Sequence, residues 1–125
     1  MTKKELMQLY YLNREILRST EELVDIKMES RNLKNGELGK RREKMINRRE
    51  EELLKKIRAC TDLRNRASAF IESIDDSLTR QIFYCRFSRC MTWQQVAYEV
   101  GGRNTNDGVR KIAERYLKKL EDIKM

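Results

Sequence analysis

The chain has 125 residues, of which 39% are apolar and 38% are charged, and its formal net charge is +8. This length allows one modest domain or two small ones, with enough apolar residues for a helical core but too few for a large enzyme pocket. Because proline is absent and only five residues are glycine, while Leu, Glu, Lys and Arg are abundant, we predict an all-α chain with few breaks.

The charge favours a polyanionic partner but does not locate a site. Residues 1–75 carry 18 basic and 14 acidic side chains, and residues 76–125 carry 10 and 6, so both parts have the same net charge. No apolar run approaches the roughly 20 residues that cross a bilayer, which predicts no membrane contact and a cytoplasmic protein.

The combinations of residues that catalysis and metal binding commonly use are missing from the sequence. There is no histidine, and Cys60, Cys85 and Cys90 form no Cys-x-x-Cys pair, so we expect no metal site. Nothing supplies a general base, an activated nucleophile or a phosphate-binding glycine loop, so we predict no enzyme activity and no cofactor. Cys60 and Cys85 fall on apolar stripes and are expected in the core, whereas Cys90, near a turn, is a candidate for exposure.

Residues 1–73 are predicted to form an antiparallel hairpin of two long, coiled-coil-like helices. The first, about residues 3–33, has a heptad seam of Leu9, Leu12, Ile16, Ser19, Leu23, Ile26, Ser30 and Leu33. The second, about residues 41–73, has a seam of Ile46, Leu53, Cys60, Ala67 and Ile74, joined by Ile57, Leu63, Phe70 and Ile71. The break at residues 34–40 contains Asn35-Gly36 and Gly39, which can adopt the positive φ of a tight connection.

Two helices bury only one seam each, and apolar side chains outside the seams need another cover: Tyr10, Tyr11, Leu17, Val24, Met45 and Leu54. The cover is either the C-terminal part of the chain or a second copy that forms a four-helix dimer, and the dimer is slightly favoured. We therefore assign residues 1–73 to oligomerisation or partner binding.

A basic cluster begins the second long helix: Lys40, Arg41, Arg42, Lys44, Arg48 and Arg49. The favoured interpretation is a solvated face that pairs with Glu43 and with the acidic residues 50–52 at helical spacing. The alternative is an auxiliary phosphate clamp or a dock for RNA polymerase.

Residues 92–100 are predicted to form a short amphipathic helix. Thr92 is a good N-cap, and Gln95 three residues later completes a capping box. One face is apolar, formed by Trp93, Val96, Ala97 and Val100. Gly101-Gly102 supplies the positive φ that ends the helix. Core packing is the favoured role of Trp93 and of at least one of the tyrosines Tyr10 and Tyr11, ahead of base stacking.

A second helix is expected from about Asp107, with Asn104, Thr105, Asn106 and Asp107 as candidate caps. Its inward stripe consists of Val109, Ile112, Ala113, Tyr116, Leu117 and Leu120. Its outer face carries Arg110, Lys111, Glu114, Arg115 and Lys118. Cations and amide groups at an exposed helix start suit the phosphates and base edges of a major groove. The alternative is an ordinary helical hairpin with a solvated face.

The segment from Ile74 to Leu120 resembles the region-four domain of sigma factors, and more closely the phage-encoded late transcription regulators of the ArpU and RinA kind. The matching residues are Ile74, Asp76, Arg80, Ile82, Tyr84-Cys85-Arg86-Phe87, Thr92-Trp93, Val96-Ala97, Val100-Gly101, Val109-Arg110-Lys111 and Arg115-Tyr116-Leu117. The resemblance implies a helix over residues 76–87, a positioning helix over residues 92–100 and a recognition helix from about Asp107, within a helix-turn-helix module of residues 74–125.

Aligning Val109 with the family's valine places Asn106, Asp107, Arg110 and Lys111 at the positions that touch promoter DNA. The full set of candidate DNA-binding residues is Arg103, Asn104, Thr105, Asn106, Asp107, Arg110, Lys111, Glu114, Arg115 and Lys118. The turn over residues 102–106 is about two residues longer than the usual sigma turn, which affects the register of Arg103, Asn104 and Thr105.

The resemblance implies a sequence-specific regulator of a phage or prophage that binds double-stranded DNA and activates late genes together with host RNA polymerase. It would work in a bacterial cytoplasm, associated with the nucleoid. Two alternatives remain open: the DNA-recognition subunit of a packaging machine, similar to the small terminase subunits that form rings, and a sigma mimic that binds RNA polymerase without reading DNA. The mass in solution identifies a ring. Charge reversal at Arg110 and Lys111 separates a regulator that reads DNA from a sigma mimic that does not.

Overall fold

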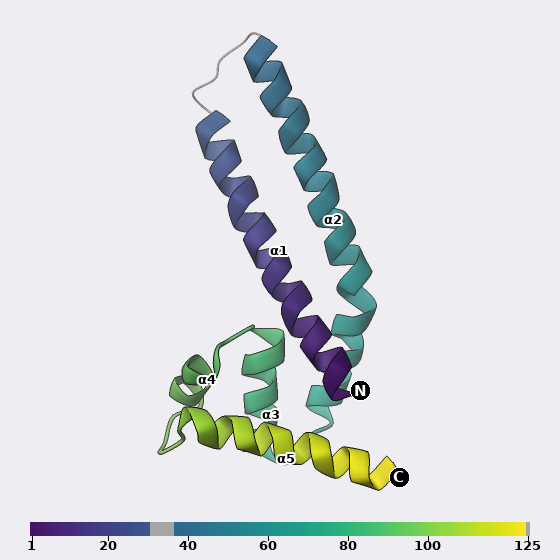
Figure 1. The fold of residues 1–125 in the computed structure, drawn as a ribbon, viewed down its shortest axis with the longest axis vertical. Helices are drawn as coiled ribbons and strands as arrows, with labels where there is room; N and C mark the ends of the chain where they lie inside the picture. Colours follow the sequence, from purple (N-terminus) through teal and green to yellow (C-terminus); the bar gives the residue numbers. More distant parts are fainter. Residues whose placement is uncertain (31–36, 125) are drawn as a thin grey trace. The chain divides into compact units, whose positions relative to one another are not determined.

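The computed structural model describes residues 1–30 and 37–124, and in these ranges the chain is all-α, without a strand (Figure 1). Its elements are α1 (Lys3–Ser30), α2 (Glu37–Glu72), α3 (Ser77–Phe83), the π-helical turn η1 (Tyr84–Ser88), α4 (Trp93–Val100) and α5 (Asn106–Lys124). The predicted all-α class is therefore confirmed. Leu33 and the predicted end of the first helix lie outside the described residues.

The start of α2 differs from the prediction. The sequence placed Gly39 in the connection between the long helices, but α2 begins at Glu37 and includes it. A glycine in a helix costs only about 1 kcal/mol relative to alanine, and the good helix formers that follow can offset it. Residues 37–40 of the predicted break thus belong to α2, and its residues 34–36, with Asn35-Gly36, lie outside the described residues.

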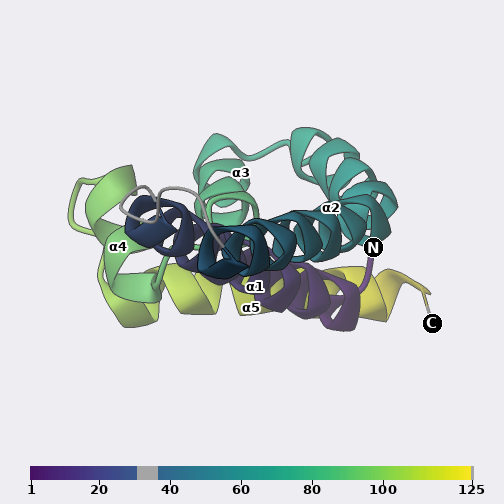
Figure 2. The same cartoon turned by 90° about the horizontal axis from the view of Figure 1, so that it is seen from above.

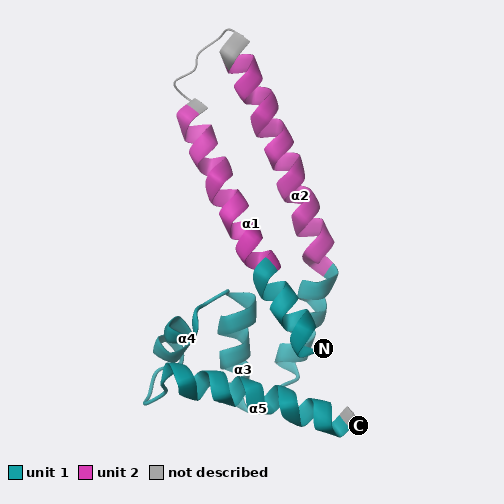
Figure 3. Ribbon diagram, viewed as in Figure 1, with its two compact units in different colours: residues 1–11, 62–125 teal, residues 12–61 magenta. Residues whose placement is uncertain are grey.

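The chain divides into two compact units, and both long helices are shared between them (Figure 3). Unit 2 consists of residues 12–61, and unit 1 consists of residues 1–11 and 62–125. The sequence had placed the boundary at residue 73, where the heptad pattern ends. The structure instead groups the first turns of α1 and the last turns of α2 with the C-terminal helices, because their apolar side chains share one core.

Unit 2 is an antiparallel pair formed by parts of α1 and α2. Ion pairs between described residues join the helices: Lys27 with Glu50, Glu22 with Arg49 at 3.9 Å and Glu15 with Lys56 at 3.2 Å. The later residues of α1 thus pair with the earlier residues of α2, as in an antiparallel pair. Seam residues of both helices are buried or half-buried: Leu12, Ile16, Ser19, Leu23, Ile26, Ile46, Leu53, Ile57 and Cys60. Ser19 is accommodated because its hydroxyl accepts a hydrogen bond of 3.1 Å from the Lys56 ammonium.

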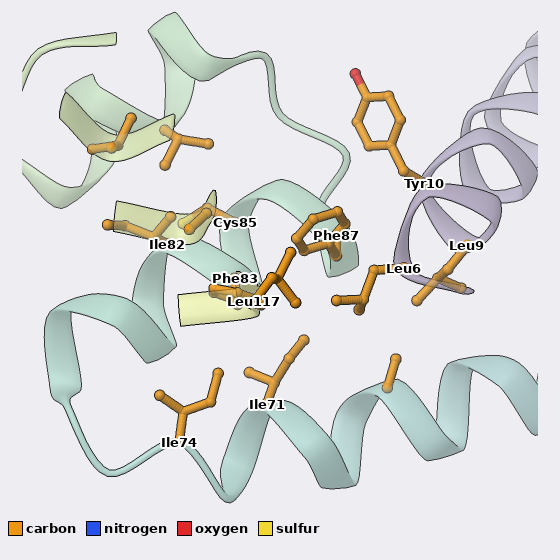
Figure 4. Close-up of a cluster of buried hydrophobic side chains, with 14 of the residues drawn as sticks. Leu6, Leu9, Tyr10, Ile71, Ile74, Ile82, Phe83, Cys85, Phe87 and Leu117 are labelled. Atoms are coloured by element: carbon orange, nitrogen blue, oxygen red, sulfur yellow. The ribbon is translucent and has the colours of Figure 1, made fainter. Parts of the chain in front are cut away.

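Unit 1 is built around a core to which all of its helices contribute. Its buried side chains are Leu6, Leu9, Tyr10, Ala67, Ile71, Ile74, Ile82, Phe83, Cys85, Phe87, Val96, Ala97, Val109, Ala113 and Leu117. Figure 4 shows Leu6 of α1 and Ile71 of α2 pointing toward the space around Phe87. In both overall views α4 lies against the first turns of α5, and α3 packs on both helices (Figures 1 and 2).

We expect Leu6→Ala to destabilise unit 1 strongly. Leu6 is fully buried, so its truncation to alanine leaves a cavity in the core. Such a substitution typically lowers the free energy of unfolding by 2–5 kcal/mol, and by about 2 kcal/mol if the surrounding side chains collapse into the cavity. The measurement is the free energy of unfolding by urea, with Gln8→Ala, an exposed position on the same helix, as the control. Equal stability of the two variants would contradict the place of residues 1–11 in this core.

The start of α3 is fixed by an acidic cap. The Asp76 carboxylate accepts hydrogen bonds from the Thr79 hydroxyl at 2.7 Å and from the Thr79 backbone N–H at 3.0 Å. These bonds, with a smaller contribution from the charge of Arg80, hold the pKa of Asp76 below its ordinary value. The Arg80 guanidinium in turn donates to the Ile74 carbonyl at 2.7 Å, so the turn before α3 is tied at two points.

This cap predicts a pH-dependent stability. A carboxylate with a lowered pKa in the folded state stabilises the fold above its unfolded pKa, about 3.9 for aspartate, and loses this contribution as pH falls through the folded value. Asp76→Asn keeps an acceptor but cannot titrate. In urea unfolding at a series of pH values, the advantage of the native chain over Asp76→Asn should therefore shrink below about pH 4. A difference that does not change with pH would contradict the assignment.

Candidate nucleic-acid interface

The start of α4 has the predicted capping box. The Thr92 hydroxyl accepts from the Gln95 backbone N–H at 3.2 Å, and the Gln95 side chain accepts from the Thr92 backbone N–H at 2.9 Å. Val96 and Ala97 are buried, and Trp93 and Val100 pack half-buried against the core. The apolar face predicted for this helix is confirmed.

Two glycines end α4 as the sequence predicted. Gly101 has φ 68° and ψ −157°, a combination that side chains exclude, and Gly102 has φ 67°. The Asn104 side chain then donates to the Gly101 carbonyl at 2.9 Å and closes the turn. Asn104, one of the candidate DNA contacts, is therefore engaged within the protein and half-buried.

Thr105 caps α5, whose first helical residue is Asn106. Its hydroxyl accepts from the Gly108 backbone N–H at 3.0 Å, and its carbonyl accepts from the Val109 N–H at 3.0 Å. A Cβ at position 108 would lie only 3.0 Å from this hydroxyl, so glycine leaves room for the cap. Of the four candidate caps, the structure selects Thr105, whose exposed hydroxyl accepts the capping bond and keeps its O–H as a donor.

The two faces of α5 are as predicted. The inward stripe is buried or half-buried: Val109, Ile112, Ala113, Tyr116, Leu117 and Leu120. The other candidate contacts are all exposed: Arg103, Asn106, Asp107, Arg110, Lys111, Glu114, Arg115 and Lys118. The structure thus places the exposed candidates of α5 on the side opposite the core, where a ligand can reach them.

Arg110 has an acidic neighbour on this face. Its guanidinium lies 3.2 Å from the Asp107 carboxylate, one helical turn earlier, and both side chains are largely exposed. An exposed pair of this kind contributes about 0–1 kcal/mol and is screened by salt. Arg110 can therefore exchange the carboxylate for a phosphate or a base edge at little cost. The other exposed cations of the face are Lys111, Arg115 and Lys118.

A second feature, not anticipated from the sequence, holds the start of α4 in place. The Arg86 guanidinium lies between two aromatic rings, 4.1 Å from the centre of Tyr10 and 4.5 Å from that of Trp93. It donates to the Met91 carbonyl at 2.9 Å and to the Tyr10 hydroxyl at 3.3 Å. Each cation–π contact is worth about 0.5–2 kcal/mol. This stack connects the first turns of α1 to the N-terminus of α4.

The chain turns sharply between η1 and α4, next to this stack. Cys90 has φ 55°, a left-handed conformation that is uncommon for residues other than glycine. Its thiol lies 3.9 Å from the Tyr10 carbonyl, and the side chain is half-buried.

Cys85 and Cys60 are buried, as predicted. Burial, with the negative charge of Glu99, raises the pKa of the Cys85 thiol, which keeps it protonated.

The described residues contain no cluster of three or more His, Cys, Asp or Glu side chains that could hold a metal ion. Nor does any helix in the described ranges have the length and apolar character that spanning a membrane requires.

Comparisons of the chain with protein-family models, curated proteins and solved structures return no significant match. The description of the candidate interface therefore rests on the geometry given above.

Proposed function

We propose that this protein is a sequence-specific DNA-binding regulator of transcription that reads the major groove with the first turns of α5. The observation that carries the proposal is the exposed face with Arg110, Lys111 and Asn106 on a helix whose opposite face is buried in the core of unit 1. Such a helix is anchored on one side and offers guanidinium, ammonium and amide groups on the other, as base readout requires.

The more specific part of the proposal is the biological setting. The resemblance of residues 74–120 to phage late regulators with a sigma-like module supports a role in activating late genes of a phage or prophage, with host RNA polymerase as a second partner. The local order of α3, η1, α4 and α5 agrees with the order of helices that this resemblance implies.

A second copy of the chain is a further proposed partner. Leu17, Val24 and Met28 are between 49% and 58% exposed in unit 2, and their spacing places them on one face of α1. Pairing of two such faces would bury them, and a twofold dimer would read an inverted repeat with half-sites about 34 Å or a multiple apart. Sedimentation equilibrium measures the mass, and a large ring would instead favour the DNA-packaging alternative.

The test of the main proposal is a selection from random double-stranded DNA at fixed salt, because phosphate contacts make affinity fall steeply with salt. We expect enrichment of one short motif, and its symmetry reports whether one or two recognition helices bind. Enrichment without any shared motif, or no enrichment, would overturn sequence-specific reading. Binding of purified bacterial RNA polymerase in that case would favour the sigma-mimic alternative.

A further inference from the structure

The first three turns of α2 carry a strong local excess of positive charge. Residues 40–49 contain six basic side chains and one acidic side chain, whereas residues 50–61 contain three of each. The net charge of the chain does not reveal this asymmetry. The excess of positive charge is nevertheless large for a single stretch of about 15 Å of helix. We call Lys40, Lys44 and Arg48 the basic stripe, because their spacing of four residues places them on one face.

The stripe is exposed, and no acidic side chain in the described ranges neutralises it. Lys40, Lys44 and Arg48 are all exposed, and none forms an ion pair with any acidic side chain that the structure describes. The sequence suggested ion pairs with Glu43 and the acidic residues 50–52, but these three cations do not form them. Glu50 pairs with Lys27 of α1 instead. Arg49, another member of the basic cluster, pairs with Glu22 of α1.

The remainder of unit 2 shows the contrasting arrangement. Lys56 lies 3.2 Å from Glu15 and also donates to Ser19, so a cation on the seam is held by the partner helix. Among the described side chains the stripe has no such partners, and like charges at i, i+4 repel each other by a few tenths of a kcal/mol per pair. An external polyanion would relieve this repulsion.

We propose that the basic stripe of α2 binds the phosphate backbone of double-stranded DNA without reading its sequence. Successive cations rise by about 6 Å along the helix, close to twice the axial spacing of about 3.4 Å between the phosphates of one DNA strand. Residues 37–61 contain no aromatic residue, so the platform on which single-stranded bases stack is missing. The described apolar residues between the stripe cations, Met45 and Ile46, are half-buried, so the stripe itself offers little apolar surface to a membrane.

This inference extends the proposed function by adding a second contact to the same DNA, but its test does not depend on sequence-specific reading. The triple variant Lys40→Gln, Lys44→Gln, Arg48→Gln is compared with Arg18→Gln, Lys55→Gln, Arg58→Gln. The control removes the same charge from three exposed positions of unit 2 that form no described ion pair. Circular dichroism verifies that both full-length variants remain helical.

Affinity for a short duplex of random sequence is measured by fluorescence anisotropy between about 50 and 200 mM salt. If each stripe cation holds one phosphate, the slope of log affinity against log salt should become shallower by about 2.7 in the stripe variant, and remain near the native value in the control. Equal losses in both variants would show that only net charge matters, and no change would show that the stripe is not used; either result overturns the proposal.

Two further readouts separate this proposal from its neighbours. Loss of binding to phosphatidylserine vesicles, with DNA binding unchanged, would assign the stripe to a membrane surface and overturn the proposal. The preference for a selected motif over random DNA should survive in the stripe variant, because α5 is the proposed reader. The native chain could bind random DNA and the selected motif equally well, while its salt slope still became shallower in the stripe variant. This result would refute the proposed function and leave the stripe inference standing.

Discussion

Reversing the two cations at the start of α5, by Arg110→Glu with Lys111→Glu, should reduce affinity for the selected DNA motif by about 100-fold or more. Both side chains are exposed, and Arg110 has only the weak contact with Asp107 to lose. Carboxylates in their place would face phosphates and base acceptors, so attraction becomes repulsion. The measurement is a binding isotherm at fixed salt with the selected motif and with a scrambled duplex.

Lys4→Glu with Arg64→Glu is the matched control. It makes the same change in net charge within unit 1 at two exposed positions on α1 and α2, so it reports the effect of total charge alone. Thermal unfolding should be nearly unchanged in both variants, because exposed substitutions typically shift stability by less than about 0.5 kcal/mol. Unchanged DNA binding in the Arg110 and Lys111 variant would show that α5 is not the recognition helix.

Replacing a core residue of α4 should have the largest effect on stability. Val96 has no exposed surface, and its side chain lies in the core of unit 1. Val96→Asp would place a carboxyl group there without a partner, at a cost of about 4 kcal/mol or more. Since domains of this size are stable by about 5–15 kcal/mol in total, we expect loss of the cooperative unfolding transition of unit 1.

Tyr98→Asp provides the control on the same helix, because Tyr98 is 87% exposed. This variant should fold and unfold nearly as the native chain does, as measured by circular dichroism and urea denaturation. A Val96→Asp chain with a native transition would show that α4 does not pack as described. It would also remove the basis for a rigidly held α5, because α4 is one of the helices packed against it.

Local features of the sequence were enough to predict most of the elements. The Thr92 and Gln95 capping box, the end of α4 at Gly101-Gly102 and the inward stripe from Val109 to Leu120 were all found where the sequence placed them. Each depends on residues within one to three helical turns of one another, where the helical period and the unsatisfied backbone groups at helix ends dictate the pattern. The exposed side of α5 follows from the same periodicity.

The boundary of the compact units was decided by tertiary contacts. The heptad pattern of α2 continues without interruption past residue 61, where unit 2 ends. A helix that packs on one partner and then on another keeps the same apolar spacing, so the pattern does not reveal the boundary. Leu6 and Ile71 join the core of α3, α4 and α5, and nothing in their local sequence distinguishes them from seam residues deeper in the hairpin.

The side chains that position the candidate interface were also decided by the tertiary structure. Arg86 and Tyr10 are 76 positions apart, so no local pattern could place the guanidinium between Tyr10 and Trp93. Asn104 and Thr105 are polar residues that suit a cap, a turn or a DNA contact equally well, and the path of the chain after Gly101 determines which bond each makes. Periodicity and caps thus determined the helices and their faces, whereas contacts between distant segments determined what each face meets.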